Sequence, residues 1–312
     1  MGAIKSLRRA ISALLQNPVL FLAGFVFALV ALPGSAISLL QQAGVAVPGG
    51  QFLSLPLGIV SFLITPFLVA GLVGMVRESF RGSTSLGTFV DSGRSNYLTM
   101  LLAFLARFAI MLVIGIVLGI VGIVLGLVVG IGAIASVGGG GAPGAAVGGV
   151  TILLLGGFAV LAVLLFVAVG LLLEFLPAAV VLDGDGPIDA LRSSAGVVLS
   201  NKLSAVGYLA VRIAVGLIVA LPTSAFVLLR TVQRFQTIQS SAGPGGPDPA
   251  QFGAALFSVP EAVALVVVGF AVSMLVTPFR LAYMTTFYDD HSDGGRRGDV
   301  GTGTRTDYGV EA

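Results

Sequence analysis

The sequence predicts an all-α, polytopic integral membrane protein with six transmembrane helices in three repeated helix pairs. Three observations predict this fold: the excess of apolar residues, long apolar runs separated by polar turns, and motifs that recur along the chain. Of the 312 residues, 56% are hydrophobic and 10% are charged, whereas soluble domains have about 25% charged residues. The mean hydropathy is +1.07. Lipid is therefore the expected solvent for most of the chain.

The composition excludes several kinds of site. The chain contains no cysteine, which excludes disulfides and thiolate metal ligands. His291 is the only histidine, so the sequence has neither a histidine metal set nor a base to activate a serine. No P-loop motif occurs, and the basic residues lie at span ends rather than in one patch. We therefore expect no enzyme, no cofactor, no metal ion and no nucleic-acid partner.

A motif at the start of the chain recurs in its second half. Residues 2–17 (GAIKSLRRAISALLQN) and 186–201 (GPIDALRSSAGVVLSN) match at an offset of 184. In both copies apolar residues recur at helical spacing, which predicts an amphipathic helix lying in the membrane interface. A signal peptide is the alternative for the first copy, but the same unit lies at 186, where no signal peptide can be. The matching residues are Gly2, Ile4, Leu7, Arg8, Leu15 and Asn17 against Gly186, Ile188, Leu191, Arg192, Leu199 and Asn201.

A second motif recurs inside two of the expected spans. SFLITPFLVA (Ser61–Ala70) and SMLVTPFRLA (Ser273–Ala282) are identical at six of ten positions. A proline inside a span removes one backbone hydrogen bond, so Pro66 and Pro278 predict matching kinks. Further matches at an offset of 105 join Asn96 with Asn201 and Arg107 with Arg212.

These matches predict three units, with approximate limits of 1–82, 83–183 and 184–290. Each unit consists of an interfacial amphipathic helix, an asparagine, a span, an outer loop and a second span with a proline. Chance similarity between apolar runs is the alternative explanation. In either case we expect residues 1–290 to form a single transmembrane domain and residues 291–312 a disordered cytoplasmic tail.

Six spans follow from the apolar runs, and one of them carries a stripe of glycines. The stripe steps by three or four residues, which lets a second helix approach closely. It predicts tight packing inside the monomer or, alternatively, the contact face of a homo-oligomer. The expected spans are about 18–40, 55–76, 97–135, 150–173 and onward to 182, 203–229 and 260–282, and the stripe is Gly115, Gly119, Gly122, Gly126 and Gly130.

The distribution of basic residues predicts the orientation. With both termini on one side, eleven lysines and arginines lie on that side, and only Arg230 and Arg234 lie on the other. Because cytoplasmic loops carry the excess of basic residues, we expect a protein of the cell membrane with both termini in the cytoplasm. The eleven are Lys5, Arg8, Arg9, Arg77, Arg81, Arg94, Arg192, Lys202, Arg296, Arg297 and Arg305.

Four charged residues interrupt the apolar runs: Arg107, Glu174, Arg212 and Arg280. Enough apolar residues separate each of them from the nearest outer loop to cross the hydrocarbon, which takes about 20 residues. All four then fall at one depth near the inner interface. In a structural interpretation, the arginines reach the headgroups and one pairs with Glu174. In a functional interpretation, the cluster binds an anionic lipid headgroup or a small anion at the inner leaflet.

The unit Gly-x-Ile-x-x-Leu-Arg, followed by an asparagine and an apolar span, resembles a group of uncharacterised multi-span membrane proteins of archaea and bacteria. These are similar to the membrane region attached to some glycerophosphodiester phosphodiesterases, and the resemblance implies no catalytic residues. We expect a membrane-organising, lipid-associating or accessory protein. A small transporter or channel subunit for an anionic or lipid-like solute is the alternative. The residues that carry the resemblance are Gly186, Ile188, Leu191, Arg192 and Asn201, with their first copy.

Overall fold

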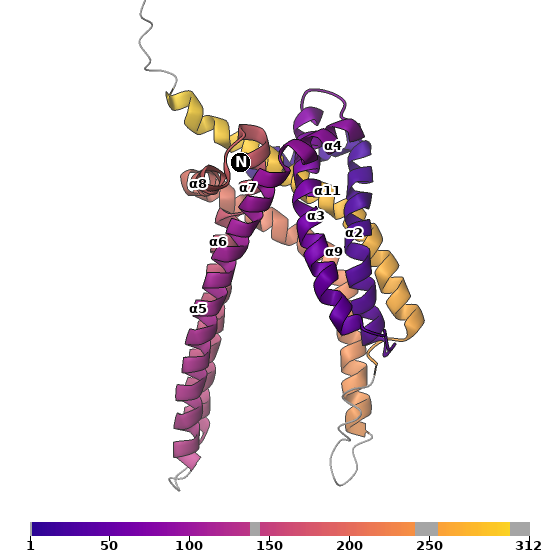
Figure 1. The fold of residues 1–312 in the computed structure, drawn as a ribbon. Helices are drawn as coiled ribbons and strands as arrows, with labels where there is room; N and C mark the ends of the chain where they lie inside the picture. Colours follow the sequence, from indigo (N-terminus) through magenta and orange to yellow (C-terminus); the bar gives the residue numbers. More distant parts are fainter. Residues whose placement is uncertain (1, 138–143, 241–254, 300–312) are drawn as a thin grey trace, which may run out of the picture.

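The computed structural model describes residues 2–137, 144–240 and 255–299, which are mostly helical and include no strand. Six of the described helices are long and apolar enough to cross a membrane. This confirms the predicted all-α fold and the number of helices that could span a membrane (Figure 1). The long helices are α2 (Val19–Gln42), α3 (Gly50–Ser79), α5 (Tyr97–Val137), α6 (Gly144–Leu172), α9 (Lys202–Ser240) and α11 (Val259–Asp299). The shorter ones are α1 (Gly2–Gln16), α4 (Leu86–Ser95), α7 (Leu176–Ala178), the π-helical turn η1 (Ala179–Asp183) and α8 (Pro187–Ser200).

Some helices are much longer than a bilayer is thick. α5 has 41 residues and α9 has 39, so at 1.5 Å per residue each measures about 60 Å. The hydrocarbon core is about 30 Å thick. α9 continues past residue 229, where the sequence predicts a loop. Residues at the start of α11 contact this part of α9 and stabilise it. There Arg230 pairs with Glu261, and the rings of Phe226 and Phe257 stack with their centroids 6.0 Å apart.

The C-terminal helix also runs further than the sequence predicts. α11 continues to Asp299, although a disordered tail is expected from residue 291. The ring of His291 stacks on Phe287 with a centroid separation of 4.2 Å. Arg9 of α1 forms ion pairs of 2.7 and 3.0 Å with Asp289 and Asp290. These contacts hold the beginning of the expected tail in the helix; residues 300–312 lie outside the described residues.

Three asparagines connect short helices to long ones: Asn17 after α1, Asn96 after α4 and Asn201 after α8. In each case, the backbone N–H and the side-chain Nδ2 both donate to the carbonyl oxygen four residues earlier. The side-chain bonds measure 3.1, 3.0 and 3.2 Å, to Ala13, Ser92 and Val197 respectively. Because the asparagine carbonyl also accepts an N–H from the next helix, each asparagine ends one helix and begins another.

The main core lies at the end of the molecule that carries α1, α4 and α8, which we call the core end. Its centre is formed by three segments at or after a proline, residues 68–76 of α3, 175–181 around Pro177, and 282–288 of α11. Away from the core end, the α5–α6 hairpin diverges from the other long helices (Figure 1). The side chains there are largely exposed, as expected for helix faces that contact lipid.

Helix α1 buries a face made mainly of small residues together with Leu14, and most of its large apolar side chains stay exposed. The large residues Ile4, Ile11 and Leu15 are exposed, while the small face lies against α11. Thr286 of α11 donates a 3.1 Å hydrogen bond to the carbonyl oxygen of Ser6. The exposed apolar side fits the predicted position in the membrane interface. The buried face consists of Ala3, Ser6, Ala10, Ala13 and Leu14.

Helix α2 packs chiefly along α11, and α9 contacts α11 less extensively. A close approach of two backbones allows the α2–α11 contact. A Cβ atom at Gly24 would lie 2.2 Å from the carbonyl oxygen of Met274 and 2.9 Å from Cδ of Pro278. Pro278 has no N–H to donate to the carbonyl four residues before it, which is the carbonyl of Met274. Gly24 therefore faces the turn of α11 in which the proline leaves a carbonyl without its usual donor.

Candidate functional site

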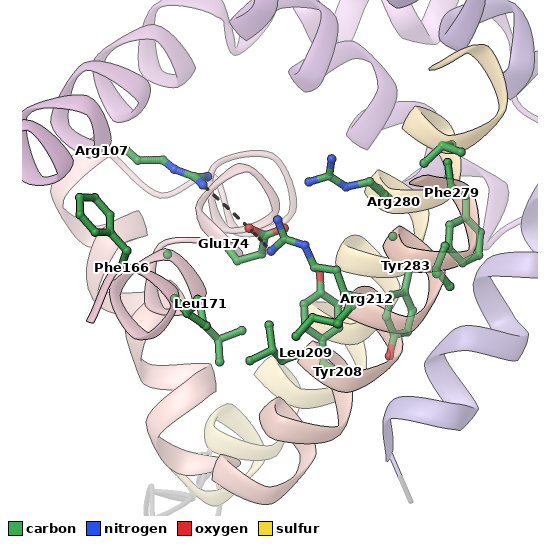
Figure 2. Close-up of a pocket in the computed structure, with 17 residues that line it drawn as sticks. Arg107, Phe166, Leu171, Glu174, Tyr208, Leu209, Arg212, Phe279, Arg280 and Tyr283 are labelled. Atoms are coloured by element: carbon green, nitrogen blue, oxygen red, sulfur yellow. Dashed lines mark ion pairs between the residues drawn. The ribbon is translucent and has the colours of Figure 1, made fainter. Parts of the chain in front are cut away.

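A cavity of about 630 Å³ lies between α5, α6, α9 and α11. All four charged residues singled out in the sequence line it, Arg107, Glu174, Arg212 and Arg280 (Figure 2). Tyr208 and Tyr283 also line it, although the Tyr283 hydroxyl donates a 3.3 Å hydrogen bond to the carbonyl oxygen of Ala3. The other lining residues are apolar or glycine. Residues from four different helices thus meet in one place.

The position of Glu174 follows from a break in the helix. Pro177 has no N–H, and its ring excludes the usual bond to the carbonyl of Leu173. α6 ends at Leu172, and helix resumes at Leu176. The freed carbonyl oxygen of Leu173 instead accepts a 3.4 Å hydrogen bond from Nη1 of Arg107. The break therefore supplies an acceptor for one arginine and places the adjacent carboxylate in the cavity.

Ser194 of α8 stabilises the same break from the core side. Its hydroxyl donates a 2.6 Å hydrogen bond to the carbonyl of Leu172 and accepts a 3.1 Å bond from the N–H of Phe175. Ser194 is fully buried, so both bonds are shielded from water. One side chain thus satisfies two backbone groups that the interrupted helix leaves open.

Glu174 is the anionic centre of the cluster, and its side chain is only 10% exposed. Its Oε2 lies 2.7 Å from Nη1 of Arg212 and 3.9 Å from Nη2 of Arg107. The two arginine side chains are 31% and 34% exposed respectively. A buried carboxylate is strongly disfavoured without a partner. The two arginines therefore explain how the charged side chain of Glu174 can be buried. The carboxylate in turn fixes their positions.

Arg280 differs from the other two arginines, because it forms no ion pair with a described residue. Figure 2 shows Arg107 and Arg280 extending from opposite sides toward the Glu174–Arg212 pair. Three guanidinium groups and one carboxylate line the cavity, which gives it a formal excess of two positive charges. Such an excess at the edge of a low-dielectric region favours an anion.

Aromatic rings form the wall of the cavity nearest the core end, which the sequence interpretation missed. The rings of Tyr208 and Tyr283 stack with centroids 4.7 Å apart, and Phe175 lies 5.0 Å from Tyr208. A signal for both tyrosines exists in the sequence. Tyr208 lies four residues before Arg212, and Tyr283 three residues after Arg280, so each shares a helix face with an arginine.

The glycine stripe of α5 lies only partly against α6. A Cβ at Gly115 would be 3.8 Å from the ring of Phe166, and one at Gly122 would be 3.1 Å from the ring of Phe158. Cβ atoms at Gly119 and Gly126 would meet nothing within 4 Å. The side-chain surroundings of Gly130 lie outside the described residues. Alternate glycines therefore admit aromatic rings of the neighbouring helix, and the others face open space.

A shallower depression of about 930 Å³ lies beside the turn between α3 and α4. Its two arginines, Arg77 and Arg81, face two carboxylates, Glu78 and Asp91, so its formal charges balance. Arg77 donates a 3.0 Å hydrogen bond to the carbonyl of Val181. Among the residues that the structure describes, no group of three or more histidine, aspartate or glutamate side chains is arranged to hold a metal ion. The cavity around Glu174 is therefore the stronger candidate site.

Comparison with known proteins identifies the family. Residues 1–291 match the family described as "Domain of unknown function (DUF7847)", and because the match covers most of the chain, the chain belongs to that family. No curated protein and no solved structure matches significantly.

Proposed function

We propose that this member of a family of unknown function is a non-enzymatic, lipid-associating protein of the cell membrane that binds an anionic lipid headgroup at the inner leaflet. The observation that carries the proposal is the cavity in which Arg107, Arg212 and Arg280 face the single carboxylate of Glu174. A phosphate group would compensate the excess charge and give Arg280 a partner. Arginine suits this role because its planar guanidinium matches two phosphate oxygens.

The depth of the cluster supports a headgroup as the ligand. Arg107 and Arg212 each follow the start of their helix by ten residues, which is about 15 Å along the axis. With the core end on the cytoplasmic side, as the excess of basic residues favours, the cluster reaches the inner interface. Beyond it, α5 still has enough residues to cross about 30 Å of hydrocarbon.

The same proposal includes three units related by an internal repeat. Its support is the sequence matches together with the three asparagine junctions, which share one hydrogen-bonding pattern. The three segments after or around a proline also meet in the core. A helix pair cannot bury its apolar surface alone, so three copies closing on one another would give a stable unit.

Selective retention of anionic lipid tests the headgroup site. The purified protein is incubated with equal amounts of dioleoylphosphatidylglycerol and dioleoylphosphatidylcholine, and the bound lipid is counted by native mass spectrometry. The wild type should retain phosphatidylglycerol preferentially. Arg280→Gln should lower this preference roughly fivefold, because a basic residue near anionic headgroups contributes about 1 kcal/mol. Arg280 has no described ion pair to lose, so this substitution should leave the fold intact.

Arg192→Gln is the matched control. Arg192 lies in α8 at the same end of the molecule, is highly exposed and does not line the cavity. Its substitution removes one positive charge without changing the site, so lipid preference should stay at the wild-type value. Equal retention of the two lipids by the wild type, or an unchanged preference in Arg280→Gln, would contradict the proposal. Passage of a solute across vesicles without any lipid preference would instead favour the transporter alternative.

A further inference from the structure

The cavity has two chemically different ends. Its charged residues lie toward the core end, and its lining away from the core end is apolar, including Phe166, Val219 and Val276. Along α9, the lining extends seven residues beyond Arg212 to Val219, a distance of roughly 10 Å. The site is thus an apolar trough with a basic head.

The trough has no protein wall on one side. α6 and α9, which flank it, make at most marginal contact with each other, and α5–α6 diverges from α9 away from the core end (Figure 1). Ile213 of α9 is half exposed although it lines the cavity. A Cβ at Gly216 would meet nothing within 4 Å, so open space adjoins the α9 side.

We infer that the seam between α6 and α9 is a lateral entrance through which a phospholipid enters from the bilayer, with its acyl chain lying in the apolar trough. The inference rests on the proposed function and specifies its ligand as a membrane amphiphile rather than a water-soluble anion. A soluble phosphate would fill only the basic head and leave the trough empty. An acyl chain gains little by leaving other chains, so the arginines provide the selectivity and the trough provides the fit.

Filling the trough without touching the charges tests the inference. Gly216→Leu places a side chain in the open space beside α9, where no steric clash opposes it. Gly269→Leu is the control, because Gly269 also adjoins open space in a long helix but does not line the cavity. We expect Gly216→Leu to lower the retention of dioleoylphosphatidylglycerol at least fivefold, and Gly269→Leu to leave it unchanged. Millimolar glycerol phosphate should not displace the lipid from the wild type.

A fluorescence measurement locates the acyl chain directly. The chain contains no tryptophan, so Phe166→Trp introduces a single reporter in the trough. Phe108→Trp is the control, because Phe108 is more than half exposed and does not line the cavity. The protein is placed in phosphatidylcholine vesicles that contain a small fraction of phosphatidylglycerol brominated on its acyl chains. The fluorescence of the trough reporter should be quenched more strongly than the fraction of brominated lipid in the vesicles predicts. The control reporter should be quenched in proportion to it.

The outcomes separate this inference from the function on which it rests. If Gly216→Leu retains phosphatidylglycerol like the wild type while Arg280→Gln loses it, the headgroup site stands and the lateral trough is wrong. The lateral trough is also wrong if quenching in Phe166→Trp is merely proportional to the fraction of brominated lipid. The same holds if glycerol phosphate displaces the lipid. If Arg280→Gln also retains the lipid, the headgroup site itself fails.

Discussion

Replacing Glu174 by glutamine separates a lipid site from a purely structural ion-pair cluster. Glu174→Gln removes the only carboxylate that lines the cavity as the structure describes it, and the formal excess rises from two positive charges to three. If the arginines bind an anionic headgroup, the loss of a competing anion should strengthen binding. If they serve only to neutralise Glu174, the substitution has no reason to increase lipid retention.

The expected size of the effect follows from the geometry. Oε2 of Glu174 lies 2.7 Å from Arg212, so a phosphate on the far side of that guanidinium would be about 6 Å from the carboxylate. Two unit charges at that distance repel by about 3 kcal/mol at an effective dielectric constant of 20. The arginines are about one-third exposed, and screening reduces the repulsion to about 1–2 kcal/mol. That corresponds to a gain in affinity of about five- to thirtyfold.

The assay is the competition between phosphatidylglycerol and phosphatidylcholine, run beside a thermal unfolding measurement. Glu174→Gln should retain more phosphatidylglycerol, and Arg280→Gln less. Without lipid, Glu174→Gln should unfold at a lower temperature, because Arg212 and Arg107 lose their anionic partner. Added phosphatidylglycerol should restore more of that stability than added phosphatidylcholine. Glu174→Gln makes the cavity more positive, and Arg280→Gln makes it less positive. If both variants lose phosphatidylglycerol retention, the reasoning is refuted, because a binding site for an anion would respond to these two changes in opposite directions.

Three further predictions concern the fold and its orientation. Gly24→Ala should destabilise the protein by about 1–3 kcal/mol in thermal unfolding, because its Cβ would lie 2.2 Å from a backbone oxygen. The control Gly269→Ala should be neutral or slightly stabilising, and equal effects of the two substitutions would contradict the α2–α11 contact. Ser194→Ala should cost about 1–3 kcal/mol, since it leaves two backbone groups without a partner, and an unchanged unfolding temperature would contradict the account of the break. In the cysteine-free chain, a membrane-impermeant maleimide applied to intact cells should label Ala46→Cys but not Ser83→Cys, and the reverse result would invert the orientation.

The sequence predicts the helices of this protein well because lipid imposes a simple rule. Every backbone group inside the bilayer must be bonded within its own segment, so a long apolar run becomes a helix. The asparagines at 17, 96 and 201 recur in the repeated motifs of the sequence, and each ends a short helix. The four charged residues stand out because the apolar runs contain few other charged residues.

The sequence does not predict which helices pack together. A helix facing lipid on one side and protein on the other is apolar all round, so hydrophobic periodicity does not mark the buried face. The contact of α2 with α11 depends on Gly24, one of 44 glycines in the chain. Likewise, α1 buries Ala3, Ser6 and Ala10, because small residues allow close packing that larger apolar side chains prevent.

Within the three-unit proposal, the cavity is explained by one junction that differs from the other two. Between the third unit and the first, α11 and α2 pack closely at Gly24, and between the first and the second, α3 packs on α5. Between the second and the third, α6 and α9 barely touch. Arg107, Glu174 and Arg212 line the cavity at this junction. Pro177 breaks its helix, whereas Pro66 and Pro278 lie within continuous helices. Three arginines share one carboxylate at this junction, and the repulsion among them opposes close packing of α6 against α9. An anionic lipid would relieve that repulsion and fill the space between the two helices.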